Sequence, residues 1–143
     1  MYTKLVKLFL RLTLASGFLS AIADRFGFWS YHVAWGSWDK FIEYTQVLLP
    51  FFGHTLIQIT AILATAFEIL LAIALLIGWK TKWAAKLSGV LLLIFGFTMF
   101  FSTGLKSAFD ASVFTAAAAA FGLSTINIRF LEISPSDPTR VRF

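Results

Sequence analysis

Four long apolar segments limit the folds that this chain can adopt. They cover residues 5–23, 55–77, 84–101 and 108–126. The hydrocarbon core of a bilayer is about 30 Å thick and a helix rises about 1.5 Å per residue, so each segment is about long enough to cross it. The 143 residues are 59% hydrophobic, more than one small soluble core could bury. We therefore expect a single all-α domain, a bundle of four transmembrane helices.

The connection between the first two segments, residues 24–54, is rich in aromatic side chains. Within it, residues recur at helical spacing after Ser37, a candidate N-cap, and before Pro50, a candidate stop. They are Trp38, Phe41, Ile42, Thr45, Leu48 and Leu49. This pattern predicts a short amphipathic helix on the outer membrane surface. Two roles stay open for it, an anchor in the headgroup layer or a lid over a site between the helices.

The basic residues indicate how the bundle is oriented. With four spans, the N-terminus, the turn at residues 79–83 and the tail at 127–143 share one side. That side collects Lys4, Lys7, Lys80, Lys82, Lys86, Arg129, Arg140 and Arg142, whereas the other side holds Arg25, Lys40 and Lys106. Because positively charged loops stay in the cytoplasm, both termini are expected there. The net charge of +5 then reflects orientation in a bilayer, and no nucleic-acid partner is expected.

Two ionisable residues fall inside the apolar segments, where a charge is costly. Arg11 lies in the first segment and Glu68 near the middle of the second. A charge at such a depth costs on the order of 3 kcal/mol, so it normally faces the bundle interior and finds a partner. We expect Arg11 and Glu68 to form a buried polar pair. The pair could be structural, fixing the register of the helices, or it could mark a functional site.

A polar stripe extends from Glu68 along one face of the second segment. Its members recur at spacings of three and four residues: His54, Gln58, Ala61, Thr65, Glu68 and Ala72. His54, Gln58, Thr65 and Glu68 are therefore candidates for binding the head of a lipid-soluble ligand, with Glu68 as the candidate proton acceptor. Hydrogen bonding between helices is the alternative role for the same side chains.

The residue pattern favours no intrinsic metal site or catalytic group. The chain has no cysteine, which excludes disulfides and thiolate ligands. Its two histidines, His32 and His54, lack the spacing of a metal or haem site. No nucleophile elbow, phosphate loop or dinucleotide fingerprint is present, so no catalytic residue is assigned.

Several motifs together resemble the DoxX family of bacterial membrane proteins. The first segment carries Leu-Arg-Leu at 10–12 and Gly-Phe-Leu at 17–19, and the connection carries Leu-Leu-Pro at 48–50. The second segment holds Glu68 and continues as Leu-Leu-Ile-Gly-Trp-Lys-Thr-Lys-Trp-Ala-Ala over residues 75–85. The resemblance implies a four-helix bundle in the bacterial cytoplasmic (inner) membrane, with the arginine and the glutamate as the family's polar positions.

The same resemblance implies a function. Some relatives are subunits of quinone-linked oxidoreductases, including systems of thiosulfate oxidation. We therefore expect a membrane subunit of a quinone-linked redox complex, with quinone as the candidate ligand and a protein partner that carries the redox group. The alternative is a non-enzymatic accessory or scaffold subunit that docks a larger assembly, in which the buried polar residues only fix helix register.

Overall fold

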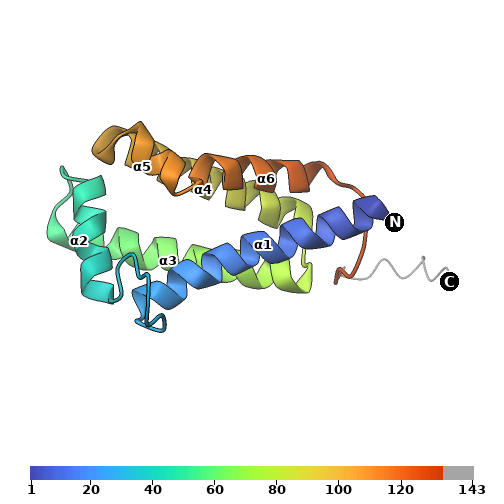
Figure 1. Cartoon of the computed structure of the whole chain (residues 1–143), viewed down its shortest axis with the longest axis horizontal. Coiled ribbons are helices and arrows are strands. Elements are labelled where there is room, and N and C mark those ends of the chain that lie inside the picture. Colours follow the sequence, from blue (N-terminus) through green and yellow to red (C-terminus); the bar gives the residue numbers. More distant parts are fainter. Residues whose placement is uncertain (134–143) are drawn as a thin grey trace.

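In the computed structural model, residues 1–133 are described and contain six helices. They are α1 (Tyr2–Arg25), α2 (Trp38–Leu48), α3 (His54–Ile77), α4 (Thr81–Thr103), α5 (Leu105–Asp110) and α6 (Val113–Thr125). Helices α1 and α3 pack together as one layer, α4 and α6 as the other, and α2 lies at one end (Figure 1). Of the tail expected over residues 127–143, the part from 134 onward lies outside the described residues.

Within residues 1–133, three helices are long and apolar enough to cross a membrane, namely α1, α3 and α4. They confirm the expected segments 5–23, 55–77 and 84–101, with ends that differ by a few residues. The turn between α3 and α4 is made by Gly78, whose φ of +74° is a left-handed conformation that side chains disfavour. The layers of the bundle are therefore joined by a tight turn.

The fourth expected segment, residues 108–126, is not one continuous helix. Helix α5 ends at Asp110 and α6 begins at Val113, and Ser112 between them has a left-handed φ of +54°. The 13 residues of α6 span about 20 Å, which is less than the roughly 30 Å of a hydrocarbon core. The expectation of four continuous membrane-spanning helices is therefore not confirmed.

The bundle has an apolar core, but it also buries charged residues and exposes many large apolar ones, which is unusual for a soluble protein. Arg11 and Glu68 each expose 1% of their surface, and Arg25 exposes 3%. The large apolar side chains on the outer face of α3 are instead exposed: Leu56, Ile59, Ile62, Leu63, Phe67, Leu70 and Ile73. A continuous apolar face of this kind is unfavourable in water but matches the hydrocarbon of a bilayer. The chain is therefore a membrane protein.

Helix α2 occupies the connection between α1 and α3. The Ser37 hydroxyl accepts a hydrogen bond from the Lys40 N–H at 3.4 Å and caps the helix, which ends two residues before Pro50. Phe41 and Ile42 are buried and pack against the first turns of α3. The position of α2 on the outer membrane surface stays a prediction.

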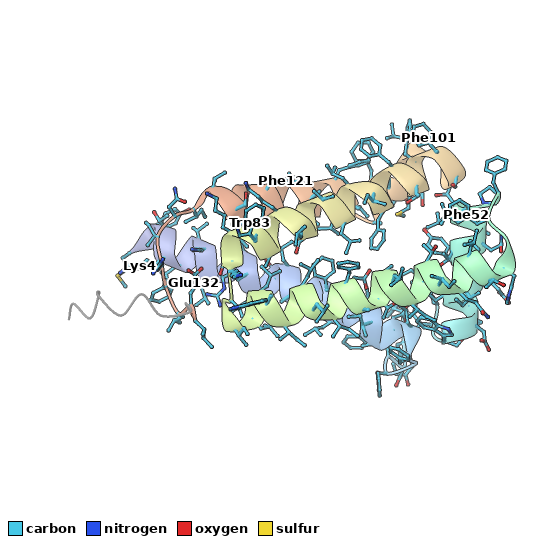
Figure 2. The ribbon with its side chains drawn as sticks, turned by 180° about the vertical axis from the view of Figure 1, so that it is seen from behind. Lys4, Phe52, Trp83, Phe101, Phe121 and Glu132 are labelled. Atoms are coloured by element: carbon cyan, nitrogen blue, oxygen red, sulfur yellow. The ribbon has the colours of Figure 1, made fainter. Side chains whose placement is uncertain are left out.

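Glycines on α4 allow close packing against α6. A Cβ atom at Gly89 would lie 2.8 Å from the Phe121 ring, and one at Gly96 would lie 2.8 Å from the Phe114 ring. Each aromatic ring therefore rests directly on the α4 backbone, as small residues permit at helix contacts in membranes. Figure 2 labels Phe121 on α6, in the layer that α4 and α6 share.

Substitution of Gly89 by alanine should lower stability. The added Cβ would displace the Phe121 ring, and such overpacking costs about 1–3 kcal/mol. Gly122→Ala on α6 is the control, because a Cβ there meets no heavy atom within 4 Å. Because alanine also favours helix more than glycine does, Gly122→Ala should not lower stability. Thermal unfolding of both variants in one detergent compares them, and equal Tm values would contradict the proposed packing.

Candidate functional site

Arg25 and Glu68 form a buried ion pair between the end of α1 and the middle of α3. Arg25 Nη1 lies 2.6 Å from Glu68 Oε2, and Arg25 Nη2 donates a hydrogen bond to Glu68 Oε1 at 2.9 Å. Arg25 Nη1 also donates to the Thr65 hydroxyl at 2.8 Å. All three side chains are buried. A two-point contact with a planar guanidinium orients the carboxylate as well as neutralising it.

Two aromatic rings cover the Arg25 guanidinium. Its Cζ lies 4.0 Å from the centroid of the Phe41 ring and 5.3 Å from that of the Trp35 ring. A cation in contact with a ring face is stabilised by about 2 kcal/mol where water is excluded. Because Trp35 precedes α2 and Phe41 lies within it, the contacts hold the connection against the end of α1.

Asp24 fixes the same connection from the neighbouring position. Its Oδ2 accepts hydrogen bonds from the backbone N–H groups of Ala34 at 3.1 Å and Trp35 at 2.8 Å. Asp24 is itself 6% exposed. A carboxylate that accepts two backbone N–H groups provides strong, charge-assisted hydrogen bonds. Asp24 and Arg25 therefore bind two different parts of the chain, the connection and α3, at the point where α1 ends.

Arg11 binds backbone carbonyls and makes no contact with Glu68. Its Nε donates to the Leu75 carbonyl at 2.9 Å and its Nη2 to the Leu76 carbonyl at 3.0 Å. Its Nη1 donates to the carbonyls of residues 130 and 131 at 3.0 and 2.8 Å. The last carbonyls of a helix lack partners within it and carry partial negative charge. These carbonyls and the neighbouring Glu132 side chain, which lies near Arg11 Nη2 beside Gly78, together offset the burial of the Arg11 charge.

The predicted pair of Arg11 and Glu68 is thus wrong, and the reason is depth. Arg11 is level with Leu75 on the antiparallel α3, and Glu68 lies seven residues earlier, about 10 Å along the axis. The partner is Arg25, which the charge pattern placed on the outer side. The available signal was the length of an arginine side chain, which lets a residue at the end of a span extend along it.

The predicted polar stripe on α3 lies in the bundle interior over only part of its length. Ala61, Thr65 and Glu68 are buried, whereas His54 and Gln58 are exposed. At the beginning of α3 the helix is covered by α2, which contacts the face of Ile57 and Ala61. His54 and Gln58 therefore lie apart from the cluster around Arg25, and their role in ligand binding stays a prediction.

A cavity of about 580 Å³ lies between the two helix layers, beside the ion pair. Its volume falls within the range of about 300–1000 Å³ that is typical of small-molecule sites. Arg25 and Glu68 contribute to its wall, and the remaining wall is mostly apolar. Its larger side chains are Leu14, Phe18, Trp35, Phe41, Tyr44, Leu48, Leu49, Leu92, Ile94, Phe95 and Met99.

Two residues that line this cavity carry hydrogen-bond donors for which no partner is found among the described residues. Arg25 Nε is buried and has no hydrogen-bond partner within residues 1–133. A buried donor without an acceptor is costly and uncommon, so it indicates a place where an acceptor atom fits. Burial also raises the pKa of the Tyr44 phenol, which keeps its hydroxyl protonated and able to donate. The cavity can therefore bind an apolar molecule that carries acceptor oxygens.

The cavity opens sideways between α1 and α6. Thr13 and Gly17 on α1, and Ser112 and Thr115 near the start of α6, line it and are nevertheless exposed. These four positions carry small side chains, so they leave the opening unobstructed.

In the part of the chain that the structure describes, there is no group of three or more His, Asp and Glu side chains that could hold a metal ion.

Double-mutant cycles should couple Glu68 to Arg25 and not to Arg11. Arg25→Met alone leaves a buried carboxylate without its partner, a loss of about 3–5 kcal/mol, and adding Glu68→Gln should recover part of this loss. Arg11→Met is the matched control, because its partners are carbonyls and its cost should add to that of Glu68→Gln. Unfolding in detergent measures all five variants. Coupling of Glu68 to Arg11 alone would contradict the geometry.

Comparisons of the chain with protein-family models, curated proteins and solved structures find no match. The resemblance to the DoxX family stays a prediction from the residues.

Proposed function

We propose that this chain is a membrane subunit of a quinone-linked redox complex, and that it binds the quinone in the cavity between its two helix layers. The observation that carries the proposal is the cavity of about 580 Å³ with a buried, ion-paired arginine in its wall. An apolar chamber with a few fixed polar groups suits a ligand that is mostly hydrocarbon and carries acceptor atoms at one end.

The residues present fit a quinone. The aromatic and aliphatic wall matches a flat ring and its apolar tail, and the free Nε of Arg25 and the hydroxyl of Tyr44 match carbonyl oxygens. When bound, a quinone accepts two electrons and two protons. It would therefore supply the redox chemistry, since the chain has no cysteine to do so. A protein partner would then deliver the electrons, as the resemblance implies.

The chain's own side chains orient the ligand and exclude water. Glu68 holds the Arg25 guanidinium in a fixed position through two contacts. The ion pair, and not solvent, therefore sets the direction in which Arg25 Nε points. As the candidate proton acceptor, Glu68 would lose its charge on taking a proton and so release Arg25. Proton uptake at Glu68 would therefore loosen the contact between α1 and α3.

The proposal includes a fourth crossing of the membrane by α5 and α6 together. The 6 residues of α5 and the 13 of α6 rise about 9 Å and 20 Å, which end to end would come close to the thickness of a hydrocarbon core. Both chain termini would then lie in the cytoplasm, and α2 would lie at the outer headgroup layer. The basic residues Lys80, Lys82 and Lys86, at the α3–α4 turn and the start of α4, support this orientation.

An accessory role without a ligand is the second candidate. It is favoured by the way Arg25 ties α1, α3 and the connection together, which is sufficient to give the pair a structural purpose. Exposed rings in the connection, among them Phe28, Trp29 and Tyr31, could then face a larger assembly. In that case the chain would co-purify with a constant partner and without quinone.

Filling the cavity should displace the quinone. Ala64 lines the cavity, so Ala64→Leu should remove most of the quinone found in an organic extract of the protein purified from a quinone-containing bacterium. Ala66→Leu, on the exposed face of the same helix, should keep it. Mass spectrometry gives the ratio of quinone to protein. Absence of quinone from the unsubstituted protein, or equal amounts in both variants, would contradict the proposal.

A further inference from the structure

We propose a second binding site, for a phosphate group, where α3 turns into α4. A cavity of about 500 Å³ lies there, between the start of α4 and residues 126–133. Its charged lining residues are Lys7, Lys80, Lys82, Arg129 and Glu132. Figure 2 labels Trp83 and Glu132 at this end of the bundle, away from Phe52 and Phe101. The site is thus at the opposite end from α2 and separate from the proposed quinone cavity.

The charges of this cavity do not cancel. Glu132 pairs with Lys7, whose Nζ lies 2.7 Å from Glu132 Oε1 and also donates to the Ile128 carbonyl at 2.6 Å. Lys80, Lys82 and Arg129 take part in no salt bridge within residues 1–133. Among the residues that the structure describes, three cations therefore remain around one cavity, where they can attract an anion.

The start of α4 adds backbone donors to the same cavity. Its N-cap residue is Lys80, which has a φ of +44°. A lysine side chain has no acceptor atom, so it does not cap the first N–H groups of the helix. The first N–H groups of a helix have no partner within it and carry partial positive charge. Helix N-termini therefore bind phosphate oxygens, and Thr81 and Lys82 present such N–H groups beside the cavity.

Thr81 provides independent evidence for a ligand. It lines the cavity and is 5% exposed, and its Oγ1 is buried without a hydrogen-bond partner in the described part of the chain. Leaving a buried hydroxyl unpaired is unfavourable, and a phosphate oxygen would give it an acceptor. The start of the helix, the cations and the hydroxyl all favour the same ligand, which is a phosphate group.

Two sources could supply that phosphate, namely the head group of an anionic phospholipid and inorganic phosphate. Trp79 and Trp83 flank the site and are 46% and 62% exposed. Exposed tryptophans at the end of membrane-spanning helices are typical of the headgroup layer. The site is therefore within reach of lipid head groups, and the experiment has to separate the two sources.

The test titrates the full chain, purified in a neutral detergent at constant ionic strength. The probes are dihexanoyl phosphatidylglycerol, dihexanoyl phosphatidylcholine and inorganic phosphate, and native mass spectrometry with thermal unfolding measures binding. Binding of phosphatidylglycerol in preference to phosphatidylcholine supports the site and identifies a lipid head group. Binding of inorganic phosphate with an affinity equal to that of phosphatidylglycerol supports the site and identifies a free anion. Binding of neither anionic probe overturns the proposal.

Matched variants separate a built site from general attraction. Lys82→Gln should weaken binding about fivefold, the effect of one basic side chain at a membrane surface. Lys86→Gln should leave binding unchanged, because Lys86 is exposed one turn further along α4 and lies over the Trp83 ring, outside the cavity lining. Thr81→Val, which keeps the shape and removes the hydroxyl, should weaken binding about fivefold. Equal losses for Lys82→Gln and Lys86→Gln, or no loss for Thr81→Val, would overturn the proposal.

Discussion

The ion pair between Arg25 and Glu68 is the contact on which the arrangement of this bundle depends. It joins the end of α1 to the middle of α3, and the same guanidinium holds α2 through Phe41. In a membrane, two apolar helices gain little from touching each other instead of lipid, so a polar contact has a large share in selecting one register. Burying both charges is unfavourable unless hydrogen bonds offset their desolvation, and here the guanidinium donates to Glu68 Oε1 and to the Thr65 hydroxyl.

The two buried arginines fix different ends of the α1–α3 layer. Arg11 closes the end of α3 by binding free carbonyls, and it also holds residues 130–131 against the bundle. Arg25 closes the opposite end, where α1 stops and the connection begins. Each end of the α1–α3 layer is thus fixed by one buried cation, and the cavity beside Glu68 lies between these two points.

Hydropathy alone was sufficient to predict the three long helices, because a span of about 20 apolar residues has few alternatives to a membrane helix. It could not predict which arginine meets Glu68, since that depends on the relative depth of α1 and α3 and on side-chain length. The break at Ser112 contains neither glycine nor proline, and its sign in the sequence is the weaker one of Asp110 and Ser112, residue types that favour a helix N-cap. The cavity arises from packing between distant segments, which periodicity within one helix does not describe.

The sideways opening between α1 and α6 has a thermodynamic consequence. A molecule that enters there comes from the hydrocarbon phase, so the quantity that governs occupancy is its mole fraction in the bilayer and not its concentration in water. Partitioning into the membrane has already removed such a molecule from water before it meets Thr13 or Gly17. For the proposed ligand, the wall of the cavity would have to compete only with lipid chains, and the donors of Arg25 and Tyr44 would distinguish the ligand from them.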